Sequence, residues 1–254
     1  MRQLLILSLF ISSSLWAQES EWPVELITVN KVNYQRNSRA SFCMRPIEMV
    51  DTIVFHHSET PTTTTPIEIN QMHLNRGSNA DPWYMVAYSY VMNTPYPGQT
   101  APIAQIAEGR PLDIVGAHAG SDAFVEMDEE QQRMWNEGRI LCGKEGGEFK
   151  LDPKQLKNGK IKANVTTIGL VIVGNYAKFG RDNPNGWTDR NPRYPTKNTL
   201  EMLARMSCQL QKKHPRMKKL SWHNFYNQTS CPGNIKDHVV QIRELAKGLG
   251  CDFN

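Results

Sequence analysis

The amino-acid sequence predicts one α/β domain, in which a β-sheet is flanked by helices and interrupted by a long insertion. Apolar, β-branched segments of strand length alternate along the chain with segments whose apolar residues recur at helical spacing. The 254 residues, of which 39% are hydrophobic, suit a single domain whose core is large enough to be stable alone. A polar stretch of weak periodicity in the middle of the chain predicts the insertion.

The first strand and the first helix follow each other directly. MVDTIVFHHS (49–58) predicts a buried strand, because it is an apolar, β-branched run that ends in turn residues. A helix over residues 66–76 comes next. Its start carries the N-cap, first-turn proline and third-position acid of a capping box, and its end carries a glycine stop: Thr65, Pro66, Glu68 and Gly77.

Two further segments predict strands. WYMVAYSYVM (83–92) and TIGLVIVGNY (167–176) are both rich in apolar residues. The second segment is apolar at consecutive positions, so both of its faces are expected to be buried. We therefore predict that residues 167–176 form a central strand.

Two segments near the end of the chain predict amphipathic helices. NTLEMLARMSCQLQKKH (198–214) has Asn198 as its expected N-cap and Glu201 three positions later. Its apolar stripe is Leu200, Leu203, Met206 and Leu210. NIKDHVVQIRELAKGLG (234–250) repeats such a stripe with Ile235, Val239, Ile242, Leu245 and Leu249.

Residues 121–163 differ from the segments on either side, because they are polar, Gly- and Lys-rich and weakly periodic. An insertion of this length between two strands is either a functional lid or a solvated excursion of the chain. The sequence leaves both interpretations open.

The first residues, MRQLLILSLFISSSLWAQES, predict a secretory signal peptide. A positive charge at Arg2 precedes an apolar run from Leu4 to Trp16, and the small residue Ala17 precedes a polar stretch. The run is too short to span a bilayer. We expect cleavage after residue 17, a mature chain of residues 18–254 that forms one domain without a membrane span, and export to the periplasm or the medium.

The charge of the chain is mild. The formal net charge is +4, and loss of residues 1–17 removes Arg2 and no acid, which leaves +3. The basic cluster KKHPRMKK (212–219) is typical of a solvated helix end and loop. Basic and aromatic residues do not alternate as they do in nucleic-acid-binding segments, so we expect no nucleic-acid partner.

Five cysteines are an odd number for an exported chain. If Cys231 holds a metal, four cysteines remain for two disulfides, with three connectivities open. Cys208 lies on one predicted helix and Cys251 just after another, so we favour this pair, which leaves Cys43 with Cys142. Free buried thiols are the alternative, although an oxidising compartment disfavours them.

The segment SWHNFYNQTSCPG (221–233) places His223 eight positions before Cys231. A catalytic zinc site takes three ligands from His, Cys and carboxylate side chains and keeps a fourth position for water. The loop between the two residues can bring both side chains to one ion. The histidines of FHHS, His56 and His57, are candidates for the third ligand, because sites in α/β proteins form where strands end.

Five segments in this order resemble the zinc-dependent N-acetylmuramoyl-L-alanine amidases: VFHHS, WYMVAYSYVM, GAHAG, NVTTIGLVIVGNY and WHNFYNQTSCPG. Phage lysozyme-type amidases and peptidoglycan recognition proteins share the fold of this family. The resemblance covers roughly residues 45–250 outside the insertion. It implies a central mixed β-sheet flanked by helices, and a monomer that acts on peptidoglycan or its fragments.

The resemblance also implies which residues form the site. The zinc ligands are His56, His223 and Cys231, and the resemblance is what selects His56 over His57, since successive strand residues point to opposite faces. Tyr88 and Thr229 match catalytic positions of the family. His118 of GAHAG matches a family histidine that is not a standard ligand, and we expect it to support the site.

The activity implied is hydrolysis, by a zinc-activated water, of the amide bond between the lactyl group of N-acetylmuramic acid and L-alanine. Some members carry a glutamate as general base where this chain has Val171. One alternative is a peptidoglycan-binding module without catalysis, although such modules typically lose a ligand. A cysteine hydrolase with Cys231 as nucleophile is a second alternative, and a domain whose histidines and cysteines are purely structural is a third.

Overall fold

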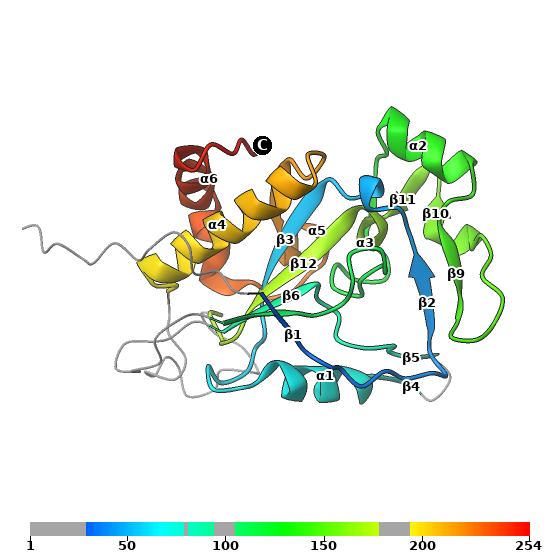
Figure 1. The fold of residues 1–254 in the computed structure, drawn as a ribbon, viewed down its shortest axis with the longest axis horizontal. Helices are drawn as coiled ribbons and strands as arrows, with labels where there is room; N and C mark the ends of the chain where they lie inside the picture. Colours follow the sequence, from blue (N-terminus) through cyan, green and yellow to red (C-terminus); the bar gives the residue numbers. More distant parts are fainter. Residues whose placement is uncertain (1–28, 79–80, 94–104, 178–193) are drawn as a thin grey trace, which may run out of the picture.

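A computed structural model gives the fold of the protein and describes residues 29–78, 81–93, 105–177 and 194–254 (Figure 1). The proposed signal peptide, residues 1–17, lies outside the described residues. Within them, no helix is long and apolar enough to cross a membrane.

A six-stranded sheet forms the centre of the domain (Figure 1). Its strands, in spatial order, are β1 (Val29–Lys31), β7 (Gln105–Glu108), β6 (Tyr90–Asn93), β12 (Thr167–Ile172), β3 (Thr52–His57) and β13 (Lys219–Trp222). The pair β6–β7 is antiparallel and the other neighbours are parallel. The predicted mixed sheet flanked by helices is therefore confirmed.

The prediction that residues 167–176 contain a central strand is also confirmed. β12 lies between β6 and β3, and each of its residues is buried. Leu170 and Ile172 belong to the core on one face of the sheet, and Val171 belongs to the core on the other. A strand with two buried faces needs the continuous apolar run seen in the sequence.

Two helices cover the first of these faces. α4 (Lys197–Lys213) and α6 (Val239–Gly248) lie side by side (Figure 1) and share the larger hydrophobic core with the sheet. The predicted stripe of α4 is buried as expected. Its N-cap is Thr196, whose hydroxyl accepts from the backbone N–H of Thr199 at 3.2 Å, so the prediction of Asn198 is wrong by two positions. The last predicted helix begins as a 3-10 helix, η3 (Gly233–His238), before α6.

α1 (Pro66–Leu74) begins with the predicted capping box. The hydroxyl of Thr65 accepts from the backbone N–H of Glu68, and the carboxylate of Glu68 accepts from the backbone N–H of Thr65. Ile69 of this helix belongs to the core on the second face of the sheet. A short hairpin, β4 (Gly77–Ser78) and β5 (Asp81–Pro82), follows α1.

The predicted strand over residues 83–92 is wrong for its first part, because a strand forms only at residues 90–93. Residues 84–87 are buried but irregular, and side chains bind their backbone where a neighbouring strand would. The backbone N–H of Val86 donates to Asn70 Oδ1 at 2.7 Å, and that of Ala87 donates to His73 Nδ1 at 3.0 Å. The Arg110 guanidinium donates to the carbonyls of Met85 and Val86.

The predicted insertion, residues 121–163, is folded. It contains β8 (Phe124–Val125), α2 (Glu129–Asn136), β9 (Leu141–Lys144), η2 (Pro153–Gln155), β10 (Leu156–Lys157) and β11 (Lys160–Lys162). Met134, Trp135 and Ile161 are buried and share a third core with Met49, a residue of η1 (Ile47–Met49). The interpretation as a solvated excursion is therefore wrong. The missed signal is the capping box of Asp128 and Gln131 that begins α2.

Both predicted disulfides are present, Cys43–Cys142 and Cys208–Cys251, and Cys231 is a free, buried thiol. The first disulfide joins β2 (Ser41–Met44) to β9 of the insertion, and the second joins α4 to the chain end after α6. Cys231 is thus the cysteine left out of disulfide pairing.

Candidate metal centre

The three predicted ligands come together at one edge of the sheet. His56 is the second-last residue of β3, and His223 begins the short helix α5 (His223–Tyr226) directly after the parallel neighbour β13. Cys231 lies in the following loop. Parallel strands end at the same edge, so β3 and β13 deliver both histidines to one place. One potential ligand atom from each of the three residues lies within 4.8 Å of the others.

The spacing of two of these atoms fits a zinc site. His56 Nδ1 lies 3.5 Å from Cys231 Sγ. A sulfur and an imidazole nitrogen on a tetrahedral zinc ion, at about 2.3 and 2.0–2.1 Å from the metal, lie about 3.6 Å apart. The His56 and His223 rings are also adjacent, with centroids 4.6 Å apart.

His223 supplies a second observation that fits a metal. Both of its ring nitrogens are buried, and neither has a hydrogen-bond partner among the described residues. A buried polar atom without a partner costs about 1–3 kcal/mol, so an unpartnered imidazole needs an explanation. A metal ion between His56, His223 and Cys231 provides one.

The protonation states of the group favour metal binding by the histidines. Burial, together with the neighbouring imidazoles, holds the pKa of His56 well below its usual value, and burial lowers the pKa of His223 to about 4. Both rings are therefore neutral near pH 7, which is the form that binds metals. Burial raises the pKa of the Cys231 thiol, so this thiolate needs a cation beside it.

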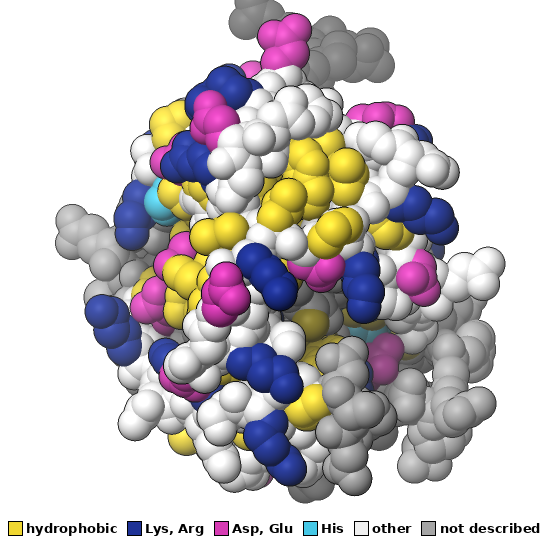
Figure 2. Space-filling model, turned by 90° about the vertical axis from the view of Figure 1, so that its right-hand side faces the viewer, with side chains coloured by type: hydrophobic (Ala, Val, Ile, Leu, Met, Phe, Trp, Pro, Cys, Tyr) yellow, Lys and Arg dark blue, Asp and Glu magenta, His cyan; other side chains and the backbone are white. Residues whose placement is uncertain are grey.

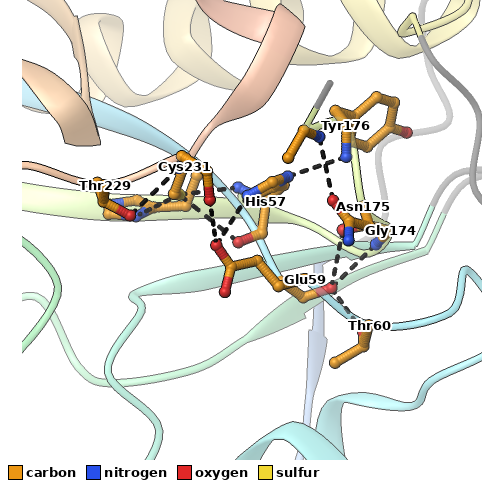
Figure 3. Close-up of polar contacts among 12 residues, drawn as sticks. His57, Glu59, Thr60, Gly174, Asn175, Tyr176, Thr229 and Cys231 are labelled. Atoms are coloured by element: carbon orange, nitrogen blue, oxygen red, sulfur yellow. Dashed lines mark hydrogen bonds and ion pairs between the residues drawn. The ribbon is translucent and has the colours of Figure 1, made fainter. Parts of the chain in front are cut away.

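The ring of His57 has partners outside the ligand group, the backbone of Tyr176 and the carboxylate of Glu59 (Figure 3). Its Nδ1 accepts from the backbone N–H of Tyr176 at 2.9 Å, and its Nε2 lies 3.3 Å from Glu59 Oε1. Its backbone N–H donates to Cys231 Sγ at 3.4 Å. The two adjacent histidines of β3 thus have different partners, as the alternation of strand residues requires.

Glu59 is a site residue that the sequence did not single out. Its carboxylate accepts from Ser230 Oγ at 3.0 Å as well as facing His57, so it joins the end of β3 to the loop that carries Cys231. The hydrogen bond from His57 lowers the pKa of Glu59 to about 2. Glu59 has a φ of 58°, which is uncommon for a residue other than glycine, and no sequence pattern marks such a position.

Tyr88 and Thr229 flank the ligand group. The Tyr88 ring lies 4.9 Å from that of His56 between centroids, and burial raises the pKa of its phenol, which keeps the hydroxyl protonated. Thr229 Oγ1 accepts from the backbone N–H of Cys231 at 3.2 Å, which leaves the hydroxyl hydrogen available to a second partner. Val171 pairs directly with His56 in the sheet and is fully buried, so no carboxylate comes from that position.

The turn after Cys231 has a backbone requirement that glycine meets. The Cys231–Pro232 peptide is cis, and Gly233 follows with a φ of 64°. A Cβ at Gly233 would lie 2.2 Å from the carbonyl oxygen of Tyr176. The CPG sequence therefore holds the cysteine loop closely against the segment after β12.

A cavity of about 410 Å³ lies beside the loop that carries His118. Its lining includes Trp83, Gly116 and Ala117, and the insertion contributes Gln155 and Lys162. Gly116 and Ala117 immediately precede His118, whose Nδ1 lies 3.1 Å from His56 Nε2, so the cavity and the ligand group share one loop. Lys, Arg, Asp and Glu side chains are interspersed on the face that Figure 2 shows, in keeping with the mild net charge of the chain.

No protein-family model matches the chain, and a search of curated proteins gives no match. Among solved structures, an endolysin N-acetylmuramoyl-L-alanine amidase from Clostridium intestinale URNW is 20% identical, with 89% of this chain and 97% of that chain covered and a TM-score of 0.49. An endolysin of a Thermus scotoductus bacteriophage is 16% identical over 78% and 84% of the two chains, with a TM-score of 0.43.

Peptidoglycan recognition protein-LE, solved in complex with tracheal cytotoxin, is also 16% identical, with 76% and 79% of the chains covered and a TM-score of 0.42. With such low identities and with TM-scores below 0.5, these likenesses carry no conclusion about activity.

Proposed function

We propose that the protein is a zinc-dependent N-acetylmuramoyl-L-alanine amidase, which hydrolyses the amide bond between the lactyl group of N-acetylmuramic acid and L-alanine. The observation that supports this most strongly is the group His56, His223 and Cys231, with ligand atoms within 4.8 Å and an imidazole whose nitrogens have no other partner among the described residues. Two imidazoles and one thiolate leave the fourth zinc position for water, as in catalytic sites. The sequence resemblance to the amidase family supports the substrate.

A zinc ion held by His56, His223 and Cys231 would supply a Lewis acid, which lowers the pKa of water and polarises a carbonyl. The Tyr88 phenol stays protonated, and the Thr229 hydroxyl keeps a hydrogen to donate. We assign both hydroxyls to hydrogen bonding with the carbonyl oxygen of the scissile amide. Removing one such donor typically costs about 2.7–4 kcal/mol of transition-state stabilisation. We assign Glu59 to holding the Cys231 loop in place through Ser230.

The cysteine-hydrolase alternative fits the site less well. Cys231 is only 4% exposed, and burial raises the pKa of its thiol. A nucleophilic cysteine needs access to the substrate and a lowered pKa. We therefore assign Cys231 to the metal.

The remaining parts of the chain receive roles that accord with this activity. We propose that residues 1–17 direct export, because two disulfides suit an oxidising compartment. We also propose that the cavity beside the loop of His118 receives the peptide part of the substrate. Gln155 and Lys162 of the predicted insertion line this cavity, so we propose that the insertion also contacts the peptide part of the substrate.

One experiment tests the proposed function. The purified protein is incubated with peptidoglycan before and after chelation and after zinc is restored, and the products are identified by mass spectrometry. We expect zinc-dependent release of stem peptides with a free L-alanine amine, which His56→Ala abolishes and the matched change His238→Ala, outside the site, does not. Binding without cleavage would favour a recognition module, and cleavage that survives both chelation and His56→Ala would exclude the metal mechanism.

A further inference from the structure

His118 connects the proposed ligand His56 to β12. Its ring is buried, with 3% of the residue exposed. Its Nδ1 lies 3.1 Å from His56 Nε2. On its other side, its Nε2 lies 3.3 Å from the hydroxyl oxygen of Thr167 and 3.5 Å from the carbonyl oxygen of the same residue.

The partners of Thr167 determine where the proton of His118 lies. The Thr167 hydroxyl donates its one hydrogen to the carbonyl oxygen of Ala163 at 2.8 Å. Its oxygen can then only accept from His118, and the Thr167 carbonyl can only accept as well. His118 Nε2 must therefore carry a hydrogen.

The proton on His118 in turn determines the tautomer of His56. The hydrogen-bond partners of the His118 ring are a threonine and another histidine, with no carboxylate among them, so the buried ring is neutral. A neutral ring with a hydrogen on Nε2 has a bare Nδ1, which accepts. His56 Nε2 faces that atom and donates, which leaves the lone pair of His56 on Nδ1, the atom 3.5 Å from Cys231 Sγ.

We infer that His118 is a positioning residue that fixes His56 in the tautomer with its hydrogen on Nε2, so that Nδ1 is presented to the metal. Thr167 fixes His118 in the same way. The consequence for metal binding rests on the proposed zinc site, whereas the positions of the hydrogens do not.

The surroundings of His118 hold its ring in one orientation, as a positioning role requires. A Cβ on Gly116 would lie 2.6 Å from His118 Cδ2, and a Cβ on Gly169 would lie 2.9 Å from His118 Cγ. The backbone N–H groups of His118 and Ala119 both donate to Asn164 Oδ1, at 3.0 and 2.8 Å. Two glycines and an asparagine thus leave a slot that fits this ring.

The same series of hydrogen bonds reaches the end of the insertion. Ala163, which accepts from Thr167, begins α3 (Ala163–Thr166), and its backbone N–H donates to the carbonyl of Ala123. The segment where the insertion rejoins the sheet therefore supports His56 through Thr167 and His118.

The tautomer can be measured in the metal-free protein. In long-range ¹H–¹⁵N correlation spectra of protein labelled at histidine, the two neutral tautomers give different coupling patterns. We expect His56 to carry its hydrogen on Nε2, and His118 likewise. A hydrogen on Nδ1 of either ring would overturn the inference, even if the protein proved to be an active amidase.

Zinc affinity, measured by competition with a chelator, provides a second test. Removing an outer partner of a metal-binding histidine typically weakens metal binding 10–100-fold. We expect a weakening of that order for His118→Phe and affinity close to wild type for His118→Asn, whose Oδ1 can accept from His56. His238→Phe, the same change outside the site, should leave zinc affinity unchanged.

If His118→Phe does not fold, Thr167→Val serves instead, because it leaves the His118 ring in place and removes the hydroxyl acceptor. We expect it to weaken zinc binding less than His118→Phe would and to give a mixture of tautomers at His118. Unchanged zinc affinity in His118→Phe would overturn the inference, and an unchanged tautomer spectrum in Thr167→Val would overturn the part of it that assigns the orientation of His118 to the Thr167 hydroxyl.

Discussion

The two faces of the central sheet are built differently. On one face, α4 and α6 pack regular apolar stripes against β3 and β12. On the other, the irregular segment 84–87 is buried against the sheet. The side chains of Asn70, His73 and Arg110 satisfy the backbone of this segment.

The difference follows from what each face must do. A helix satisfies its own backbone, so its stability comes mainly from the apolar area that it buries. An irregular buried segment must find a partner for each N–H and C=O group. Here polar side chains supply several of these partners, and the backbone N–H groups of Asn37 and Ala117 supply others. Tyr88, the residue that follows this irregular segment, lies next to His56 on the second face.

The largest expected effect tests the polar support of the second face. Arg110 is 4% exposed and donates to the carbonyls of Met85, Val86 and Val115. Hydrogen bonds from a charged donor are worth about 1.5–3 kcal/mol each, so Arg110→Met should destabilise the protein by about 5 kcal/mol. Urea unfolding measures the change.

The exposed Arg133, paired with Glu130 and Glu137, is the matched control, and Arg133→Met should change stability by less than about 1 kcal/mol. If the two arginine variants lost similar stability, the polar side chains would not be what supports the second face.

The next effect tests the apolar face. Leu203 of α4 is fully buried in the larger core. Leu203→Ala should cost about 3 kcal/mol, within the usual range for such truncations, and should leave zinc affinity unchanged. Val240→Ala on α6, where the side chain is 68% exposed, should cost little. A large loss of zinc affinity in Leu203→Ala would show that the two faces are not independent.

A smaller effect is expected on the second face of the sheet, at Gly169 of β12. A Cβ there would lie 2.9 Å from His118 Cγ and 3.1 Å from Tyr88 Cδ1. Gly169→Ala should cost about 1–3 kcal/mol by overpacking and should also weaken zinc binding, although it removes no polar group. Chelator competition and thermal unfolding measure the two effects.

Gly248→Ala, in α6 with no atom within 4 Å of the added Cβ, is the control and should be neutral or slightly stabilising. Equal zinc affinity in the two glycine variants would argue against a tightly held His118 ring.

The smallest expected effect concerns Glu59 and depends on pH. Its folded-state pKa of about 2 lies below the ordinary value of 4.5, so its contribution to stability is fully present above about pH 4.5 and is lost as the pH falls through 2. Glu59→Gln should cost about 1 kcal/mol near pH 7, since part of the carboxylate is exposed to solvent. Urea unfolding at several pH values should show the difference from wild type shrink as the pH falls towards 2 and vanish below it; a constant difference would contradict the expected hydrogen bonds to the Glu59 carboxylate.

The face covered by α4 and α6 could be predicted well from the sequence, and the second face, with its irregular segment 84–87, could not. Helical stripes and the double-faced strand β12 are periodic, so their positions follow from spacing alone. Residues 83–89 have the composition of a strand, and nothing near them in the sequence indicates that Asn70 and Arg110 will bind their backbone. The start of α4 was missed because Thr196 and Asn198 are both good N-caps.

The site likewise contains residues that the sequence identifies and residues that it does not. The residues His56, His223 and Cys231 stand in a recognisable order, and the structure brings these three side chains together. The sequence does not single out Glu59 or the Thr167 hydroxyl, since Ser230 and His118, the partners that give them a place in the site, lie 171 and 49 positions away in the chain. Their roles depend on the tertiary fold, which single-sequence patterns do not encode.

The pattern of disulfides has a consequence for how the chain is made. Cys43 pairs with the next cysteine along the chain, but Cys208 passes over Cys231 to pair with Cys251. An oxidase that joined cysteines in the order of their synthesis would link Cys208 to Cys231 and consume the thiol that the metal needs. Correct maturation therefore requires Cys231 to be buried, bound to metal or released by disulfide exchange, and the final disulfide of Cys208 must wait for Cys251, which follows Cys231 by 20 positions.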